Sequence, residues 1–204
     1  MKRRDCLKLT ALSAGAVLSS STVSAMVRLQ GARRRFGLQL FTVREQWKNA
    51  PVQTIEAVAR MGFKEIEMFG FGRNIFVEDP LHGLSPRELK RVLDDCGLSI
   101  PTTTITADVD IPGVAKIAHE LGIRYLTVAM APEMITVTWD SVILSGVTGV
   151  EQLKILADRL NKLGRESKEN GLGLAYHNHQ MEFTPLKEPR GTLAFDFLMQ
   201  ETDP

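Results

Sequence analysis

Residues 58–70 read Val-Ala-Arg-Met-Gly-Phe-Lys-Glu-Ile-Glu-Met-Phe-Gly, and they join the end of an amphipathic pattern to a short apolar run. Glycine adopts the left-handed conformation without a Cβ penalty, so Gly62 predicts the end of a helix. The run that follows, residues 65–70, has the length and composition of a strand. The stretch therefore predicts a helix that ends at a glycine and leads directly into a strand.

The same junction occurs four times along the chain, and its glycines are Gly62, Gly97, Gly122 and Gly171. Strands are expected at residues 36–41, 65–70, 99–106, 125–130 and 173–179, and a fifth helix is expected at residues 192–201. Strands that alternate with helices form a mostly parallel sheet. The sequence therefore predicts an α/β protein, either a (β/α)8 TIM barrel or an open five-stranded doubly wound sheet.

The length of the repeated unit bears on this choice. Each unit takes about 36 residues, so eight units would need roughly 290 residues in a closed barrel. The chain has 204 residues, which accommodates about five units. We therefore expect residues 36–204 to form a C-terminally truncated barrel. The open flavodoxin-type alternative predicts a Gly- or Ser-rich phosphate turn after the first strand, which residues 41–46 do not supply.

The composition is that of a globular protein, with 44% hydrophobic and 24% charged residues. Lys and Arg total 25, Asp and Glu total 24, and the formal charge is +1. This balance argues against a nucleic-acid partner, because proteins that bind phosphate backbones carry a strong positive charge. The only cysteines are Cys6 and Cys96, so no disulfide framework is expected.

Residues 1–25 have the pattern of an export signal: basic residues 2–4, a Ser- and Gly-rich apolar stretch, and small residues at 23–25. Residues 3–8, Arg-Arg-Asp-Cys-Leu-Lys, are similar to the twin-arginine pattern. The apolar stretch falls short of the roughly 20 strongly apolar residues of a membrane span. We expect residues 26–35 to be a linker, the twin-arginine export machinery to be a partner, and the mature protein to be periplasmic or secreted.

Polar residues at strand ends are the candidates for chemistry, because functional groups of parallel α/β proteins gather at the carboxyl ends of strands. The richest stretch is residues 176–183, Tyr-His-Asn-His-Gln-Met-Glu-Phe. His177 and His179 fall on one side of an extended segment, and imidazoles with the Glu182 carboxylate suit Mn, Fe, Co or Zn better than Ca. A hydrogen-bonded histidine pair is the structural alternative. Glu67 lies in an apolar strand and predicts a pocket or a partner, because an unpaired buried carboxylate is costly.

Several stretches together resemble the sugar phosphate isomerase/epimerase family, whose domain is a xylose isomerase-like TIM barrel. These stretches are residues 37–44 (Gly-Leu-Gln-Leu-Phe-Thr-Val-Arg), 58–67, 160–164 (Leu-Asn-Lys-Leu-Gly) and 176–179 (Tyr-His-Asn-His), with Glu182 and Phe183. The resemblance covers residues 36–204. It implies a metal-dependent sugar or sugar phosphate isomerase or epimerase, which acts by proton transfer next to a carbonyl or hydroxyl.

The resemblance also implies roles for individual residues. Glu182 and His177 are implied as catalytic residues and as ligands of a divalent metal, Mn, Zn, Co or Mg. The expected carbohydrate contacts are His179 and Asn178 from the resemblance, and Gln39 and Glu67 from their places at strand ends. Relatives draw further ligands from later strands, so we expect incomplete coordination in this chain. The uncovered edges of an incomplete sheet predict self-association, hence a homo-oligomer.

Other functions remain open. A non-catalytic exported sugar-binding protein would use Trp47 and Trp139 at the rim of its site. A flavodoxin-type regulator would require the open sheet. The sequence has no Gly-x-Ser-x-Gly, Walker or Cys-x-x-Cys pattern, which removes the usual support for a serine hydrolase, a nucleotide hydrolase or a zinc ribbon.

Overall fold

The computed structural model describes residues 35–72, 78–137, 142–144, 149–186 and 191–203. The chain divides into a unit of residues 1–35 and a unit of residues 36–204. The expected signal segment, residues 1–25, and the expected linker up to residue 34 lie outside the described residues. Within the described ranges, every helix is too short or too polar to traverse a membrane.

Five parallel strands form the sheet of residues 36–204, in the order β1, β2, β3, β4, β7. They are β1 (Gly37–Gln39), β2 (Glu65–Phe71), β3 (Ser99–Thr106), β4 (Tyr125–Met130) and β7 (Gly173–Tyr176). Each strand therefore pairs with the sheet strand that precedes it in the chain. A flavodoxin-type sheet reverses its strand order at a switch point. The observed order excludes the open doubly wound alternative and confirms the α/β class with part of a barrel.

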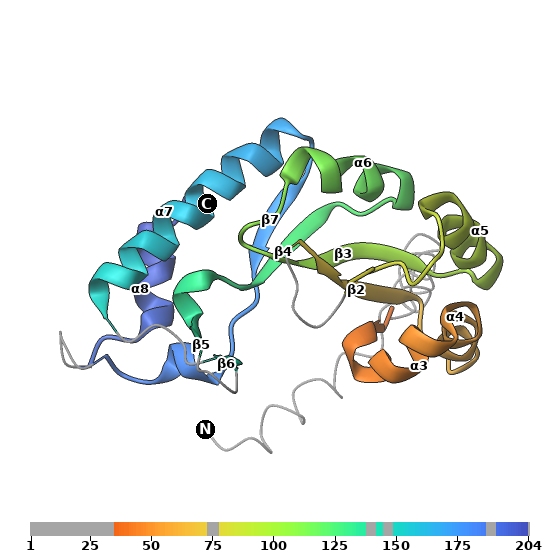
Figure 1. Cartoon of the computed structure of the whole chain (residues 1–204), viewed down its shortest axis with the longest axis horizontal. Coiled ribbons are helices and arrows are strands. Elements are labelled where there is room, and N and C mark those ends of the chain that lie inside the picture. Colours follow the sequence, from red (N-terminus) through yellow and green to blue (C-terminus); the bar gives the residue numbers. More distant parts are fainter. Residues whose placement is uncertain (1–34, 73–77, 138–141, 145–148, 187–190, 204) are drawn as a thin grey trace, which may run out of the picture. The chain divides into compact units, whose positions relative to one another are not determined.

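Helices connect the strands and form one layer beside the sheet (Figure 1). They are α4 (Pro51–Arg60), α5 (Pro86–Cys96), α6 (Ile111–Leu121), α7 (Val150–Glu169) and α8 (Ala194–Glu201), and each contacts the next. Alternate strand residues are buried against this layer, among them Ile66, Met68, Ile105, Leu126 and Val128. The apolar core thus lies between the sheet and its helices, and the opposite face of the sheet is left for other side chains.

Local signals explain where the helices begin and end. The Ser85 hydroxyl accepts a 3.2 Å hydrogen bond from the Glu88 backbone N–H, and the Glu88 carboxylate accepts one of 2.8 Å from the Ser85 N–H. This capping box begins α5, with Pro86 in its first turn. Gly97 ends the helix at a φ of 64°, as the glycine junctions predict.

The first and fifth expected strands are shorter than the sequence predicts. Residues Leu40–Val43 form the 3-10 helix η1, which leads into α3 (Arg44–Asn49). The last strand ends at Tyr176, because another 3-10 helix, η3 (Gln180–Phe183), follows the short link after it. The alternation expected to carry through residue 179 therefore stops early, although the His177 N–H still donates to the Val128 carbonyl of β4 at 2.9 Å.

Two further differences concern the second half of the chain. An antiparallel hairpin of β5 (Ile135–Val137) and β6 (Val142–Leu144) follows the 3-10 helix η2 (Pro132–Met134) and was not expected. Helix α8 begins at Ala194 and not at residue 192, because Leu193 pairs with Pro185 in a β-bridge.

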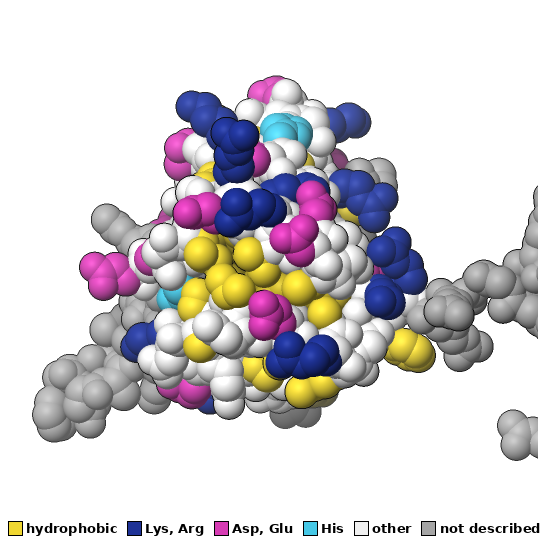
Figure 2. All heavy atoms as spheres, turned by 90° about the vertical axis from the view of Figure 1, so that its right-hand side faces the viewer, with side chains coloured by type: hydrophobic (Ala, Val, Ile, Leu, Met, Phe, Trp, Pro, Cys, Tyr) yellow, Lys and Arg dark blue, Asp and Glu magenta, His cyan; other side chains and the backbone are white. Residues whose placement is uncertain are grey.

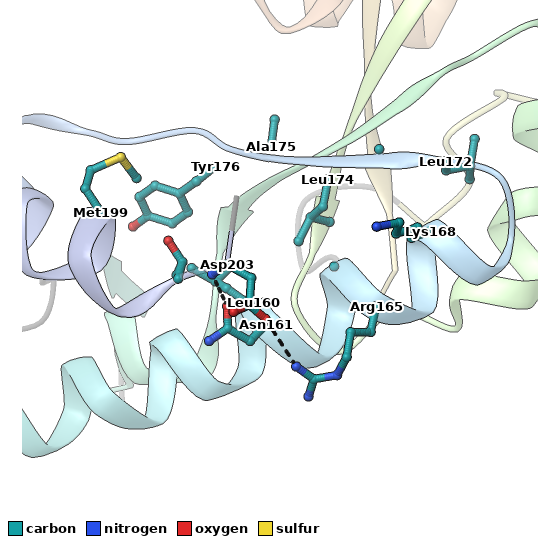
Figure 3. Close-up of a pocket in the computed structure, with 13 residues that line it drawn as sticks. Leu160, Asn161, Arg165, Lys168, Leu172, Leu174, Ala175, Tyr176, Met199 and Asp203 are labelled. Atoms are coloured by element: carbon teal, nitrogen blue, oxygen red, sulfur yellow. Dashed lines mark hydrogen bonds and ion pairs between the residues drawn. The ribbon is translucent and has the colours of Figure 1, made fainter.

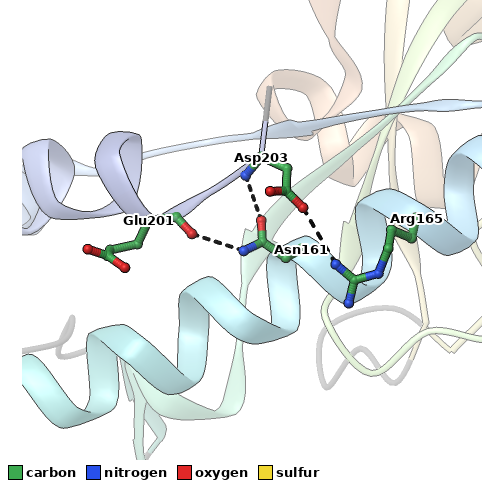
Figure 4. A network of polar contacts seen from close by, with 4 residues as sticks. All are labelled: Asn161, Arg165, Glu201 and Asp203. Carbon is green, nitrogen blue, oxygen red and sulfur yellow. Dashed lines mark hydrogen bonds and ion pairs between the residues drawn. The ribbon is translucent and has the colours of Figure 1, made fainter.

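The outer edge of β7 borders a groove of about 730 Å³ between this strand, α7 and α8 (Figure 3). Gly173 donates its N–H to the Arg124 carbonyl just before β4, and His177 donates its N–H to the Val128 carbonyl of β4. Backbone groups alternate in a parallel strand, so those of Leu174 and Tyr176 face the groove. Asn161 of α7 closes one wall: its side chain donates to the Glu201 carbonyl at 2.9 Å and accepts from the Asp203 N–H at 2.7 Å (Figure 4).

The opposite end of the sheet, at β1, also carries exposed apolar side chains. Phe36 and Met61 are 64% and 72% exposed. Seen from the side of α4 and α5, apolar side chains gather between charged ones (Figure 2). Strand edges and apolar patches favour association of copies, so the homo-oligomer stays a prediction.

Candidate functional site

The sheet face opposite the helices is polar, and we call it the inner face. Its paired residues are, strand by strand, Gly37 and Gln39, Glu65 and Glu67, Thr102 and Thr104, Tyr125 and Thr127, and Gly173 and Ala175. Barrel interiors are commonly filled by Val, Ile and Leu. Here hydroxyl, amide and carboxylate groups replace them, so the inner face suits a polar ligand.

Gln39, Thr104 and Glu67 form a chain of hydrogen bonds across three neighbouring strands. The Thr104 hydroxyl donates to Glu67 Oε1 at 2.9 Å, and the Gln39 amide nitrogen donates to the Thr104 hydroxyl at 3.4 Å. All three side chains are half-buried. The fold therefore joins two of the predicted substrate contacts through Thr104. Strand alternation from Thr102 is the signal that places Thr104 beside them.

An irregularity in the pairing of β2 with β3 produces this arrangement. Glu65 pairs with Ser99, whereas Glu67 pairs with Thr102, so β3 holds one extra residue between them. Pro101 lies in this stretch, where a missing backbone N–H is tolerated. The bulge sets which β3 hydroxyls share a face with Glu67.

Hydroxyl groups continue toward the amino ends of the strands. Thr102 and Thr127 are linked by a hydrogen bond of 2.7 Å between β3 and β4. The ring of Tyr125 lies across Gly173, where an added Cβ would come within 2.5 Å of the ring. The small residue of β7 therefore makes room for an aromatic ring on the inner face.

Aromatic side chains stand beside the carboxyl ends of β1 and β2. Phe41 meets Phe69 edge to face, with ring centroids 5.3 Å apart. The Arg44 guanidinium lies 4.7 Å from the centre of the Phe41 ring and donates to the Phe41 carbonyl at 3.2 Å. Phe69 follows Glu67 by one alternation of β2. This pair provides an apolar wall next to the polar chain.

The two predicted histidines lie together after β7. The rings of His177 and His179 are 5.0 Å apart and tilted by 45°, and both side chains are half-buried. Burial lowers the pKa of His179, the neighbouring His177 lowers it further, and the Glu182 carboxylate opposes the change. A neutral imidazole can accept a proton. Asn178 is exposed, and its amide donates to the His179 carbonyl at 3.4 Å.

Glu182 is buried, with 4% of its surface exposed. Its Oε1 accepts from the Tyr176 hydroxyl at 2.7 Å, and its Oε2 accepts from the His179 N–H at 2.8 Å. Burial raises the pKa of Tyr176, as do the hydrogen bond to Glu182 and its charge. The role of Glu182 as base or ligand stays a prediction, and each of its oxygens keeps a lone pair besides the hydrogen bond it accepts.

The described side chains do not fit a complete metal site. Among them, no three His, Cys, Asp or Glu residues are grouped so as to hold a metal ion. His177 and Glu182 are the two predicted donors, and the structure groups no third such residue with them among the described side chains. Divalent metals of this class take four or more ligands, so the donor set here is incomplete.

The tryptophans expected at a sugar-binding rim are placed differently. Trp47 is buried at 1% exposure and packs edge to face on His82, with ring centroids 5.6 Å apart. It is therefore part of the core. Trp139 lies outside the described residues.

Comparison of the chain with known protein families finds no match. An inosose dehydratase of Clostridium beijerinckii is 36% identical over 63 residues, which are 30% of this chain and 21% of that protein. Two sugar phosphate isomerase/epimerase structures from Parabacteroides distasonis superpose with TM-scores of 0.65 and 0.64 at 21% and 23% identity. They cover 95% and 84% of this chain, which spans about two thirds of each (67% and 66%). The expected likeness is thereby confirmed at the level of the fold.

Proposed function

We propose that this protein acts on a carbohydrate as a sugar isomerase or epimerase, moving a proton next to a carbonyl or hydroxyl group. One observation carries the proposal: Gln39, Thr104 and Glu67 line up across three strands of a fold shared with sugar phosphate isomerase/epimerase structures. Such a row of amide, hydroxyl and carboxylate groups matches the alternating hydroxyls of a sugar. The Phe41 ring, which is 45% exposed and packs on the buried Phe69, offers a surface for the apolar face of the sugar.

In this proposal each group has one task. Gln39 and Glu67 bind sugar hydroxyls and fix the orientation of the ring or chain. His177 moves the proton, because its imidazole is half-buried after β7 and lies against His179. Asn178 and His179 contact substrate on the same side. Glu182 holds the backbone of His179 through its 2.8 Å hydrogen bond.

The divalent metal implied by the resemblance remains a prediction. When bound, such an ion polarises a substrate oxygen as a Lewis acid. His177 is the donor that this chain offers most directly, and none of the steps above depends on the ion. Metal analysis of the purified full chain, before and after dialysis against a chelator, measures whether one is held.

Proton transfer can be tested directly by hydrogen–deuterium exchange at carbon. The full chain is incubated in D2O with D-fructose, D-xylulose or an inosose, and loss of the proton signal beside the carbonyl is followed by NMR. We expect exchange that is lost in His177→Gln, while a control variant of the exposed helical histidine, His119→Gln, keeps it. If neither the unmodified chain nor His119→Gln exchanges the carbon-bound proton of any of these sugars, the enzymatic proposal is wrong.

A binding protein without turnover is the second candidate. The observation that favours it is the structural use of the Glu182 carboxylate, which is 4% exposed and binds the Tyr176 hydroxyl and the His179 N–H. This candidate keeps the sugar contacts of Gln39 and Glu67 and gives His177 no proton to move. Saturable sugar binding by calorimetry without exchange at carbon is its signature.

Export is a separate part of the proposal. It rests on the signal pattern of residues 1–25 and on Arg3 and Arg4. We expect a C-terminally tagged chain to appear in the periplasm or medium in shortened form. The double variant Arg3→Lys and Arg4→Lys should stay in the cytoplasm, and periplasmic location of that variant would contradict the twin-arginine route.

A further inference from the structure

We infer that the inner face selects uncharged sugars or polyols over their phosphate esters, and that Glu67 is the residue that sets this preference. The inference rests on the proposed function, because it takes the inner face to be the carbohydrate site. It goes further by excluding one of the two substrate classes, sugar and sugar phosphate.

The charged side chains on the strands of the sheet are all acidic. The described strands β1, β2, β3, β4 and β7 contain no Lys, Arg or His, and their charged residues are Glu65 and Glu67. Register with β1 and β3 places both on the inner face. Glu65 has an interaction partner of its own, so the charge that a ligand over these strands meets is that of Glu67, with no strand-borne cation beside it.

Hydrogen-bond direction reinforces the charge. The single proton of the Thr104 hydroxyl is used on Glu67 Oε1, and its oxygen accepts from Gln39. Among the described residues, Glu67 Oε2, Gln39 Oε1 and the second N–H of Gln39 have no hydrogen-bond partner, so acceptors outnumber donors. Acceptors need donors. Sugar hydroxyls donate, whereas a phosphate dianion brings only acceptor oxygens and negative charge.

Among the described residues near the carboxyl ends of these strands, charged side chains do not make the local charge positive. Asp108, after β3, accepts from the Thr106 hydroxyl at 2.6 Å and adds a carboxylate. Glu133, after β4, is paired with Arg159 of α7. Within the described ranges, Arg44 is a cation beside this end, and its guanidinium is held over the Phe41 ring.

The discriminating experiment measures binding of matched ligand pairs to the full chain by calorimetry. The pairs are D-fructose and its 6-phosphate, D-xylulose and its 5-phosphate, and myo-inositol and its 1-phosphate. We expect at least one neutral member to bind. The affinity for its phosphate ester should be lower by about tenfold or more, because like charges at short range repel strongly in a protein site. The ratio of the affinity for the neutral ligand to that for its ester, the neutral-to-ester ratio, should fall when NaCl is raised to about 0.5 M, because salt screens the repulsion.

Two variants locate the effect. Glu67→Gln keeps an acceptor for Thr104 but removes the charge, so the neutral-to-ester ratio should fall at least about threefold. Glu120→Gln removes an exposed carboxylate on α6 and should leave the ratio unchanged. Circular dichroism melts confirm that both variants fold. If Glu67→Gln fails to fold, the salt dependence of the unmodified chain decides alone.

The outcomes separate this inference from the proposed function. An ester that binds as tightly as its neutral partner, or more tightly, overturns the inference and leaves the carbohydrate site in place. A ratio that is equal in Glu67→Gln and the unmodified chain removes Glu67 as the determinant. Failure of every neutral and phosphorylated ligand to bind overturns both proposals together.

Discussion

The Tyr176 hydroxyl donates a 2.7 Å hydrogen bond to the Glu182 carboxylate and so ties the end of β7 to the 3-10 helix η3. The second oxygen of Glu182 holds the backbone of His179. One buried carboxylate thus fixes the segment that carries both histidines.

Removing the Tyr176 hydroxyl should therefore destabilise the fold. In Tyr176→Phe the buried Glu182 oxygen loses its donor, and an unsatisfied buried group of this kind costs about 1–3 kcal/mol. Urea unfolding measures the change in free energy. The matched control is Tyr125→Phe, whose ring is 50% exposed and which should unfold as the unmodified chain does. Equal unfolding free energies for the two variants would contradict a structural role for this bond.

The polar chain on the inner face should behave as a unit. Thr104→Val removes the hydroxyl that links Gln39 to Glu67 and should weaken sugar binding, with about 1 kcal/mol lost in stability. Gln39→Leu removes the other end of the chain. Because the two residues are in contact, the double variant should lose less than the sum of the single losses. Calorimetric affinities for the four proteins test this, and strict additivity would show that the residues act separately.

Stability should rise with pH through the titration of His82. Burial lowers the pKa of His82 below its usual 6.5, and Lys48 adds to this, while Asp79 opposes it. The unfolded chain therefore binds more protons just below pH 6.5, so the unfolding free energy increases with pH in that window and then levels off. His82→Asn removes the titrating group and suits the left-handed backbone, whose φ is 48°. Its unfolding free energy should change less between about pH 5 and pH 7.5.

The hydrogen bonds from Asn161 to the end of α8 should stabilise that end locally, with little effect on the global unfolding free energy. Asn161→Ala removes the acceptor of the Asp203 N–H and the donor to the Glu201 carbonyl, so residues 201–203 should exchange their amide protons faster. The global unfolding free energy should move by about 1 kcal/mol or less. Exchange followed by mass spectrometry measures the first effect. Lys162→Ala, which lies on the same helix and forms an exposed ion pair, serves as the control.

The middle of the sheet follows closely from the sequence. Strands β3 and β4 have the bounds that their β-branched and apolar residues predict, Ser99–Thr106 and Tyr125–Met130. The ends depart from prediction for a local reason: after Gln39 and after Tyr176 the chain turns into 3-10 helices that apolar patterning does not register. Hydrophobicity indicates burial, but it does not show where extended backbone stops.

The sequence predicts several residues of the candidate site, but it does not predict the hydrogen bonds between them. Strand ends identified Gln39 and Glu67, but the hydroxyl that joins them depends on the register of β2 with β3. The burial of Glu182 was also missed. Its spacing from His179, three residues on, is that of a capping box, although histidine replaces the usual Ser or Thr.

The extra residue near Pro101 ties the chemistry of this protein to strand length. Side chains alternate along a strand, so deleting one residue there would turn the threonine hydroxyls into the helix layer and expose apolar neighbours in their place. In a screen of single-codon deletions, deletion of Pro101 should therefore abolish ligand binding, whereas deletions in surface turns should be tolerated far more often. Selection would therefore remove insertions and deletions at Pro101 from any homologue that keeps the site.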